Sequence, residues 1–569
     1  SWWSLALPMA RRMGLGRSPS GTWIAFVPIA LMAAAAGLAV WLLLGQLGSR
    51  REASPAPIAG AQLAPPPAAP VGVPHDSASP SAAPTRSPLR AVGRVPRAAL
   101  ACGVVAWLSA ASWSIVMPPF QVPDEPAHFA YAQDLAETGR LPASKSVIYS
   151  PEQLATEEDL DHNEVRFSAL RGTISSPAQQ QRLEQDLARP LPRHGEGAGV
   201  AATQPPLYYA LQAIPYRLAS SGNLLESLAL MKLLSALMAG CAALFAYLFL
   251  REALPGVPWA WTVGGLGVGL FPLLGFMSGA VNPDSMLCAV SAALFYCLAR
   301  AFRRGLSTRM AVAIGVVTAV GFLTKLNFLG LVPGLTLALA ILTRRAVRSE
   351  GRTAYRSLAL AVAIGALPVC VYALINILSN HPGLGEASSG IDLTSKHKSL
   401  LGEIGYIWQL YLPRLPGMAN DFPGLLTSRL WFDRSVGLYG WLDTTFPTWV
   451  YTAALLPAGL IVALCARALL ASRAELRRRI WESLAYVTMG LGVVVLVGAD
   501  SFLQFPERAG GYTEPRYFLP MAVLFGTVFA LAARGAGRRW GPAVGALIVV
   551  LILGHDIFSQ LLVVSRYYY

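Results

Sequence analysis

Charged side chains are scarce in this sequence: Asp, Glu, Lys and Arg make up 13% of its 569 residues, whereas hydrophobic residues make up 54%. In soluble proteins about a quarter of the residues are charged, so the composition excludes an ordinary soluble domain. The mean hydropathy of +0.48 agrees with this. Apolar runs of about 20 residues, long enough to cross a bilayer, recur along the chain. The sequence therefore predicts an all-α, polytopic integral membrane protein.

Cysteine is rare as well, and the positions of the cysteines indicate neither metal binding nor disulfide formation. All six cysteines fall inside predicted membrane spans, at no spacing typical of metal ligands. Neither disulfides nor zinc is indicated, and we interpret these residues as packing side chains. The sequence also contains neither a P-loop nor a Rossmann glycine pattern after a strand, so no soluble nucleotide-binding domain is expected. The cysteines are Cys102, Cys241, Cys288, Cys297, Cys370 and Cys465.

Eleven apolar segments predict the core helices of a membrane domain that covers residues 98–562. Residues 1–97 comprise an apolar stretch at 23–45, which would add one N-terminal helix, and a Pro/Ala/Ser-rich segment that is predicted to be a disordered linker. Residues 563–569 are expected to form a C-terminal tail. The core helices are expected near 98–117, 228–250, 258–279, 283–302, 309–324, 326–343, 356–379, 448–470, 481–503, 514–534 and 540–562.

Basic residues outnumber acidic ones, which gives a net charge of +14. This charge could attract nucleic acid, but the arginines cluster in short connections between apolar runs, a pattern that marks the cytoplasmic side of membrane proteins. We therefore expect a lipid bilayer as partner and no nucleic acid. The long loops 118–227 and 380–447 then both face outward, where they are expected to carry interfacial helices. The clustered arginines are Arg300, Arg303, Arg304, Arg309, Arg344, Arg345, Arg348, Arg352, Arg356, Arg473, Arg477, Arg478, Arg479, Arg534, Arg538 and Arg539.

The first outer loop opens with MPPFQVPDEPAHFAYAQ, residues 117–133, which places Asp124, Glu125 and His128 at the predicted membrane surface. Asp124 could serve only as the N-cap of the following helix, with Pro126 in its first turn. Helix geometry also places His128 one turn from the two carboxylates, on the same face. A carboxylate at a boundary between water and membrane is suited to remove a proton from an incoming hydroxyl. The motif alone allows both interpretations.

Two cations also lie at the outer boundary, Lys325 in FLTKLNFLG and Arg516 in YTEPRYFLP. One interpretation is structural: Lys325 extends to lipid headgroups, and Arg516 pairs with Glu507 or Glu514. The other is a paired cationic site for a phosphate or pyrophosphate, to which arginine contributes a bidentate fork and lysine a compact charge. Because Arg516 starts a helix whose dipole opposes a cation, a negative group is expected nearby.

Other polar and aromatic residues gather on the same outer side. In ATQPPLYYALQAIPYRL (202–218), Tyr208 either belongs to an aromatic belt of the membrane or lines a site. In SGAVNPDSM, Asn282 and Asp284 either cap the following helix or face that site. The aromatic residues of loop 380–447, among them Trp441, could stack on a sugar or could belong to an interfacial helix on the membrane.

Taken in chain order, the Asp-Glu pair, QPPLYY, NPD, TKLN and EPRYFLP resemble the multi-span bacterial proteins catalogued as domain of unknown function 2142, to which SVGLYGWLDTTFP (435–447) is also similar. The resemblance covers residues 98–562. That family in turn resembles the GT-C superfamily of integral-membrane glycosyltransferases, in which the first outer loop carries an Asp-Glu pair and the sugar donor is a polyprenyl phosphate. Gln204 departs from the pattern, because better-studied relatives tend to have a basic residue there.

The resemblance implies a role for each site residue. Asp124 would be the general base, and Glu125 would orient the acceptor or, where a divalent metal such as Mg or Mn is used, bind it together with Asp124. Lys325 and Arg516 would hold the donor phosphate and stabilise the charge that develops as the sugar–phosphate bond breaks. No other cofactor is implied. The residues expected to line the substrate site are His128, Tyr208, Asn282, Asp284 and Trp441.

Together these observations predict a GT-C-like glycosyltransferase of the bacterial cytoplasmic membrane, with its active site on the periplasmic or outer face. It would move a sugar from a polyprenyl-phosphate donor to a hydroxyl on a cell-envelope glycan or lipid. The alternatives are a transporter or flippase of lipid-linked saccharides and an oligosaccharide polymerase or ligase. A transporter predicts an internal repeat and charged residues near the middle of its spans, and the sequence reading identifies neither.

Overall fold

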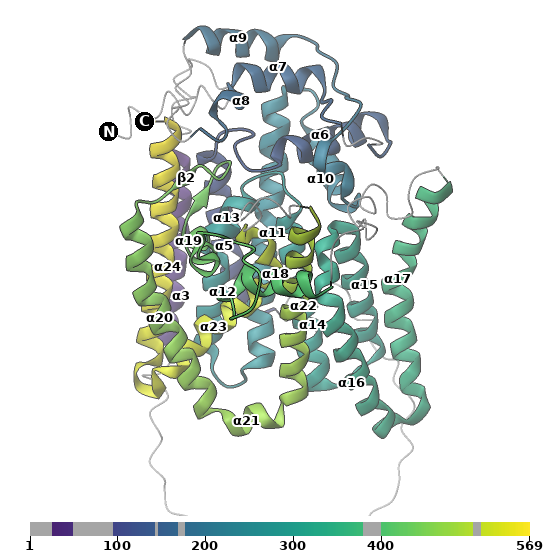
Figure 1. Ribbon diagram of the computed structural model, residues 1–569, viewed down its shortest axis with the longest axis vertical. Helices are drawn as coiled ribbons and strands as arrows, with labels where there is room; N and C mark the ends of the chain where they lie inside the picture. The colour runs from purple at the N-terminus through teal and green to yellow at the C-terminus, as the bar shows by residue number, and fades with distance from the viewer. Residues whose placement is uncertain are drawn as a thin grey trace, which may run out of the picture.

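The computed structural model describes residues 26–48, 95–142, 146–168, 177–378, 400–504 and 514–568, and helices make up most of them (Figure 1). Ten of the described helices are long and apolar enough to cross a membrane, and a bent pair of helices raises this number to eleven. The prediction of an all-α polytopic membrane protein is confirmed. Nearly all of the predicted linker, and residues 380–399 of the second long loop, lie outside the described residues.

The spanning elements follow the predicted segments closely. They are α3 (Val27–Gly48), α5 (Arg97–Val116), α11 (Leu224–Ala253), α12 (Pro258–Gly269), α13 (Pro272–Ser278), α14 (Asp284–Arg304), η3 (Leu326–Leu331), α16 (Val332–Glu350), α17 (Ala354–Leu378), α20 (Thr448–Ala471), α22 (Ile480–Gln504), η6 (Pro515–Met521), α23 (Ala522–Gly535) and α24 (Gly537–Tyr568). The predicted segment 309–324 forms α15 (Thr308–Thr324), an apolar helix shorter than the counted spans. The last helix therefore includes residues 563–568, which were expected to form a tail.

Shorter elements make up the connections. They are α6 (Glu125–Thr138), α7 (Pro151–Asp159), α8 (His162–Val165), α9 (Pro177–Ala188), η2 (Gly199–Thr203), α10 (Leu207–Leu218), η4 (Gly351–Thr353), α18 (Leu400–Tyr411), α19 (Thr427–Val436), α21 (Arg473–Arg478) and an antiparallel pair of strands, β1 (Leu438–Tyr439) and β2 (Thr444–Thr445).

Helix α11 lies at the centre of the bundle, in contact with α5, α12 and α14. Glycines permit the closest helix crossings: a Cβ added at Gly240 would lie 2.8 Å from the carbonyl oxygen of Gly103, and one added at Gly264 would lie 2.6 Å from that of Gly526. Helices in lipid associate largely by such close packing of small residues, because burial of apolar surface gives little advantage there.

One predicted span, 258–279, is broken into two helices. Between α12 and α13 the chain bends by 51°. Pro272 begins α13 and explains the break, since it has no N–H to donate and its ring clashes with a preceding carbonyl of a continuous helix. The short helix α13 is consequently turned beneath the outer loops, where its side chains line a pocket described below.

The N-terminal apolar stretch forms a helix that is part of the bundle. In α3, Ala35, Ala39 and Leu42 are buried at helical spacing, and the helix packs on α5 and also contacts α12 and α24. The sequence alone left this helix as an optional addition to the core. Its contacts with α5 make it an integral element of the fold.

A polar cluster inside the bundle joins its early and late helices. Asp556 of α24 is fully buried, and its carboxylate accepts hydrogen bonds from Ser109 Oγ at 2.6 Å and from Trp113 Nε1 at 2.8 Å, both in α5. One turn further along α24, Gln560 accepts a bond from Ser112 at 2.6 Å. An ionisable residue therefore does lie within a span, which corrects the sequence reading. The cluster fixes α24 against α5 in one register.

The two long loops meet at one end of the bundle. Figure 1 shows α6 to α10 above this end, and the strands β1 and β2 beneath them. Trp441 Nε1, in the turn between the strands, donates a 3.0 Å hydrogen bond to the carbonyl of Phe120 in the first loop. The helical connection α21 lies at the opposite end. Both long loops therefore lie on the same side, and the arginine-rich connection that includes α21 lies on the other.

This arrangement predicts the labelling pattern of single cysteines in a background whose six native cysteines are replaced by alanine. Asn163→Cys and Arg414→Cys lie in the first and second long loops, and Arg477→Cys lies in α21; all three positions are exposed. A thiol reagent that cannot cross the membrane should modify the first two from one side and the third only from the other. Labelling of Asn163→Cys and Arg414→Cys from opposite sides would contradict the fold.

Candidate functional site

Asp124 stands at the start of the outer elements in a backbone conformation that few residues adopt. Its φ is 65°, in the left-handed region, and its side chain makes no cap hydrogen bond to α6. The capping interpretation of Asp124 is therefore wrong. Aspartate is among the residues that tolerate this region best after glycine. Instead of capping the helix, its carboxylate forms an ion pair with Arg516, 2.8 Å away.

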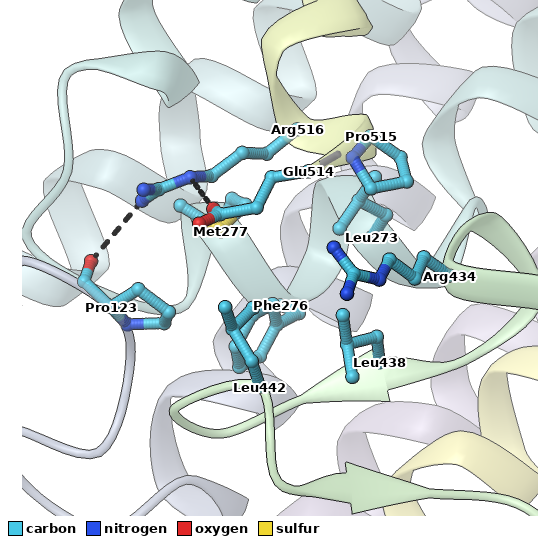
Figure 2. Close-up of a pocket in the computed structure, with 10 residues that line it drawn as sticks. All are labelled: Pro123, Leu273, Phe276, Met277, Arg434, Leu438, Leu442, Glu514, Pro515 and Arg516. Atoms are coloured by element: carbon cyan, nitrogen blue, oxygen red, sulfur yellow. Dashed lines mark hydrogen bonds and ion pairs between the residues drawn. The ribbon is translucent and has the colours of Figure 1, made fainter. Parts of the chain in front are cut away.

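Arg516 lies in η6, where its side chain is buried between two carboxylates. Its Nη2 is 2.8 Å from Asp124 Oδ2, and its Nε is 2.5 Å from Glu514 Oε2. Nη1 donates to the carbonyl of Pro123 at 3.5 Å, as Figure 2 shows. The predicted pairing of Arg516 with Glu514 is confirmed, and the other predicted partner, Glu507, lies outside the described residues.

Lys325 follows the last residue of α15, and its side chain is buried instead of extending to lipid headgroups. Its Nζ pairs with Asp284 Oδ1 at 2.7 Å. The ring of Tyr517 lies 5.8 Å from this Nζ and 5.1 Å from the guanidinium carbon of Arg516. The two cations, 191 positions apart in the sequence, thus both lie near the ring of Tyr517, which attracts them.

Glu125 has different partners from its neighbour Asp124. Its side chain is fully buried and accepts backbone N–H bonds from Phe120 at 2.9 Å and Val281 at 3.1 Å. Lys232 of α11, also buried, lies 3.3 Å from the same carboxylate. Glu125 therefore fixes the start of α6 to α11 and to the tip before α14. These partners account for both carboxylate oxygens, and they hold Glu125 inside the protein.

The NPD tip joins the same group of residues. Asn282 Oδ1 accepts the N–H of Asp284 at 2.9 Å, but Pro283 is the N-cap of α14, so the prediction of Asn282 as N-cap is wrong by one residue. Its Nδ2 donates to the Pro123 carbonyl at 3.4 Å. Asp284 is the first residue of α14, and its carboxylate is the partner of Lys325. The tip thus positions one carboxylate and also supports the loop that carries Asp124.

His128 and the tyrosines of the QPPLYY segment form a packed layer beside these charges. The His128 Nδ1 lies 2.8 Å from the Tyr209 hydroxyl, and Tyr209 stacks on Tyr131 with 3.7 Å between ring centroids. Tyr208 is fully buried and bonds to Ser235 at 2.8 Å, so it does not belong to a lipid-facing belt. These residues position α6 and α10 rather than line the pocket at Arg516.

A pocket with about 280 Å³ of empty space, open to solvent on one side, lies next to Arg516 (Figure 2). Its apolar wall comes from α13, from the first strand and from the turn after it. Charged residues from two segments stand around this wall: Glu514 and Arg516 at the start of η6, and Arg434 of α19, which the sequence did not single out. The lining residues are Pro123, Leu273, Phe276, Met277, Arg434, Leu438, Leu442, Glu514, Pro515 and Arg516.

Trp441 adjoins this pocket through Leu442 but faces the first outer loop. Its ring packs edge-to-face against Phe167, with 5.4 Å between centroids, and against His162 at 5.7 Å. The guanidinium carbon of Arg166 lies 5.6 Å from the ring centroid. The structure therefore places Trp441 at a junction between the two loops, in a protein contact.

Burial and neighbouring charges set the protonation of the site. Burial would raise the pKa of Asp124, but the positive charges of Arg516 and Lys325 hold it below its ordinary value. Burial raises the pKa of Glu514, an effect that Arg516 opposes. Burial lowers the pKa of His128 to about 3, so its ring is neutral at physiological pH. Asp124 is therefore an ionised carboxylate beside a neutral imidazole.

The geometry does not favour a metal held by the adjacent carboxylates. Asp124 and Glu125 have separate partners, so they do not form a two-carboxylate site. Among the described residues, no group of three or more His, Cys, Asp or Glu side chains is placed to hold a metal ion. The expectation that this pair could bind Mg or Mn therefore has no support in the arrangement of its side chains.

Comparison with known proteins gives one match. A family model described as predicted membrane protein (DUF2142) matches residues 107–525, well over half of the chain. The matched range includes Asp124, Lys325 and Arg516, and it confirms the resemblance read from the motifs. No curated protein and no solved structure shows a significant match.

The two adjacent carboxylates are expected to respond differently to loss of charge. Glu125→Gln leaves Lys232 buried without its carboxylate and should cost about 3–5 kcal/mol, visible as a lower thermal midpoint in detergent. Asp124→Asn should cost less, because asparagine tolerates the left-handed backbone and Arg516 keeps Glu514 as a partner. Equal losses for the two variants would contradict this division, and Glu125→Gln/Lys232→Met should recover part of the loss.

The contribution of Asp124 to stability should also depend on pH. Its folded pKa is lowered, so the stabilisation is complete above the unfolded pKa and is lost as the pH falls through the folded value. The difference in thermal midpoint between the parent and Asp124→Asn should be constant from about pH 6 to 8 and should shrink only below about pH 4. A difference that disappears already near neutral pH would contradict the ion pair.

Proposed function

This chain belongs to the family described as predicted membrane protein (DUF2142), and from the paired charges at its outer loops we propose that it is a glycosyltransferase. The donor would be a sugar linked to a polyprenyl phosphate. The acceptor would be a hydroxyl on a cell-envelope glycan or lipid. The observation that carries the proposal is the ion pair between Asp124 and Arg516, which stands beside a pocket with an apolar wall.

The cations suit the donor. A guanidinium and an ammonium that lie near one aromatic ring, and that both lower the pKa of Asp124, can hold the oxygens of one phosphate. At rest each cation has a carboxylate partner, so the site holds its charges without a ligand. A bound phosphate would compete with Asp124 for Arg516. Donor binding would thereby release the Asp124 carboxylate at the point where the acceptor arrives.

Asp124 suits the role of general base. It is ionised, and its side chain is 29% exposed whereas that of Glu125 is fully buried. In the transfer, the acceptor hydroxyl gives its proton to Asp124, and its oxygen forms a bond to the anomeric carbon. The bond between that carbon and the phosphate oxygen breaks, and its electron pair stays on the lipid phosphate. Arg516 and Lys325 stabilise this developing charge, an effect that is largest away from bulk water.

The lipid-linked donor follows from where the site lies. The pocket wall is built from Leu273, Phe276 and Met277 of α13, together with Leu438 and Leu442, side chains that suit the apolar part of a ligand better than a nucleotide. The arginine-rich connections lie at the other end of the bundle, which favours a bacterial cytoplasmic membrane with the site on its outer face. Nucleotide sugars are absent outside the cytoplasm, whereas polyprenyl-phosphate sugars are reached from the bilayer. An oligosaccharide polymerase or ligase would use the same groups with a longer donor.

A transporter or flippase of lipid-linked saccharides is the second candidate, and Asp556 is the observation that favours it. Ionisable residues inside a span often mark a transport path. The partners of Asp556, however, are the neutral side chains of Ser109 and Trp113, and they fix one helix to another. The charge pairs that could change partners gather instead at the outer loops.

The test is the envelope glycan of a strain that lacks this chain, compared by mass with its parent. Loss of one saccharide unit from a glycan or lipid is expected. A plasmid copy of Asp124→Asn should fail to restore the unit, because loss of a general base lowers the rate by roughly 10²–10⁴-fold. Asp161→Asn is the matched control, since Asp161 also has a left-handed backbone, with φ 51°.

Three outcomes separate the candidates. Restoration by Asp161→Asn and not by Asp124→Asn, at equal amounts in the membrane, supports the transferase. Full restoration by Asp124→Asn would overturn it. In a transporter that uses Asp556, Asp556→Asn should abolish function, whereas a transferase should keep much of it, because asparagine can still accept the bonds from Ser109 and Trp113. The lipid-linked donor pool of the deletion strain gives a further comparison. An unchanged donor pool together with loss of the product would indicate transfer rather than transport.

A further inference from the structure

The opposite end of the bundle carries a second concentration of charge, built around Glu252. Helix α14 begins at Asp284 in the candidate site and ends at Arg304. At a rise of about 1.5 Å per residue, its 21 residues span roughly 30 Å, which matches the thickness of the hydrocarbon core of a bilayer. The Glu252 cluster therefore lies at one membrane boundary when the candidate site lies at the other.

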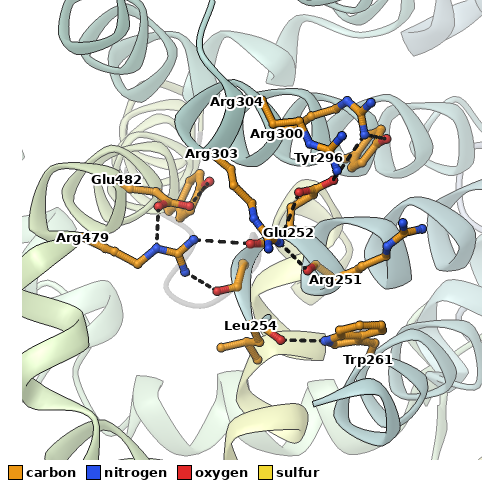
Figure 3. Close-up of polar contacts among 12 residues, drawn as sticks. Arg251, Glu252, Leu254, Trp261, Tyr296, Arg300, Arg303, Arg304, Arg479 and Glu482 are labelled. Atoms are coloured by element: carbon orange, nitrogen blue, oxygen red, sulfur yellow. Dashed lines mark hydrogen bonds and ion pairs between the residues drawn. The ribbon is translucent and has the colours of Figure 1, made fainter. Parts of the chain in front are cut away.

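Glu252 itself is almost fully enclosed, with 2% of its side chain exposed, near the end of α11. Three guanidinium groups from the end of α14 surround it: Arg300 at 3.3 Å, Arg303 at 3.4 Å and Arg304 at 3.1 Å, as Figure 3 shows. A single carboxylate can neutralise only one of these charges. The pairs thus hold the arginines in place without cancelling them.

A fourth arginine reaches the same helix end from α21 and α22. Arg479 donates to the backbone carbonyls of Glu252 and Ala253, which end α11 without partners of their own. Its Nε also pairs with Glu482 at 3.2 Å. The arginines of α14 and Arg479 therefore meet at one helix end (Figure 3).

The charges of the cluster do not balance. Within it, six arginines accompany three glutamates, so three positive charges remain uncompensated. The arginines of α14 are also open to ligands, because 34%, 41% and 52% of the side chains of Arg300, Arg303 and Arg304 are exposed. The arginines are Arg300, Arg303, Arg304, Arg345, Arg478 and Arg479, and the glutamates are Glu252, Glu475 and Glu482.

We propose that this cluster is a binding site for the phosphodiester headgroup of an anionic phospholipid. Guanidinium groups bind phosphate oxygens through paired N–H donors, and basic pockets between helices at a membrane boundary suit such headgroups. Next to Arg479, the start of α22 exposes Ile480 by 49% and Trp481 by 53%. These apolar side chains provide a surface for the acyl chains of the same lipid. The site is independent of the transferase proposal.

The lipid should compete with Glu252 for the arginines. In the structure the carboxylate occupies the donors that a phosphodiester would use. A bound headgroup would take one or two of the three guanidinium groups and leave at least one for Glu252. Removal of the Glu252 carboxylate should therefore increase the affinity of the cluster for lipid. A cluster that serves only to hold α11 against α14 would show no such increase.

The test uses the purified full chain and native mass spectrometry to measure the Kd of phosphatidylglycerol, with phosphatidylcholine of the same acyl chains as the comparison. The parent should bind phosphatidylglycerol more tightly. Arg300→Gln/Arg304→Gln should weaken this binding by roughly fivefold for each arginine removed, and Glu252 keeps Arg303 as a partner. Arg473→Gln/Arg477→Gln removes two exposed arginines of the same end and should change the Kd by less than about twofold.

A second variant changes the Kd in the opposite direction. Glu252→Gln frees the three guanidinium groups and should tighten phosphatidylglycerol binding, even though the fold loses stability. Equal weakening by the two double variants would show general attraction to a basic surface, and an unchanged Kd in Arg300→Gln/Arg304→Gln would place the lipid elsewhere. Glycerol 3-phosphate that displaces the lipid at equal concentration would indicate a soluble phosphate site. Any of these three results overturns the proposal.

Discussion

A charge withdrawn from water at a membrane boundary needs an opposite charge, and the outer half of this protein is organised by that constraint. Desolvation of an isolated ion costs several kcal/mol, which a well-placed partner offsets. Three ion pairs meet this need: Asp124 with Arg516, Asp284 with Lys325, and Glu125 with Lys232. Each joins segments that are distant in the sequence. The loops above the bundle are consequently fixed to the helix ends by charge as much as by apolar packing.

The left-handed backbone at Asp124 explains how two neighbouring carboxylates come to have different environments. In a regular helix start, both would follow the helix and share one set of neighbours. With φ at 65°, the chain turns sharply between them. Glu125 enters the protein and meets Lys232 and two backbone amides, while Asp124 remains partly exposed and pairs with Arg516, which lines the pocket. A fixed carboxylate and a partly exposed one are thus produced by a single backbone feature.

Hydropathy predicted the spans well because a bilayer imposes length and apolarity on every helix that crosses it. From the motifs, Asp124, Asp284, Lys325 and Arg516 were also predicted to lie close together. What could not be predicted was the direction of each side chain. The backbone at Asp124 has no signature in the residue types around it, and Lys232 looked like an ordinary interruption of an apolar run.

Other differences have identifiable signals that were available in the sequence. Pro272, following Phe271, marked the break between α12 and α13, because proline disrupts a continuous helix. Asp556 lies within an apolar run, and a carboxylate in that position indicates a buried residue with hydrogen-bonding partners in neighbouring helices. Arg434 had no such signal: it reaches the pocket only because α19 and β1 fold back beneath the first loop, and that contact is set by tertiary structure.

The cluster formed by Asp556, Ser109, Trp113, Ser112 and Gln560 has a consequence for biogenesis. Helix α5 is synthesised more than 400 residues before its polar partners in α24. Until α24 has been synthesised, Ser109 and Ser112 lack those partners, and α24 must then bring a carboxyl group through lipid to reach them. These contacts between α5 and α24 therefore form late in the assembly of the bundle. A chain interrupted before α24 would present an unclosed polar seam to the quality-control proteases of the membrane.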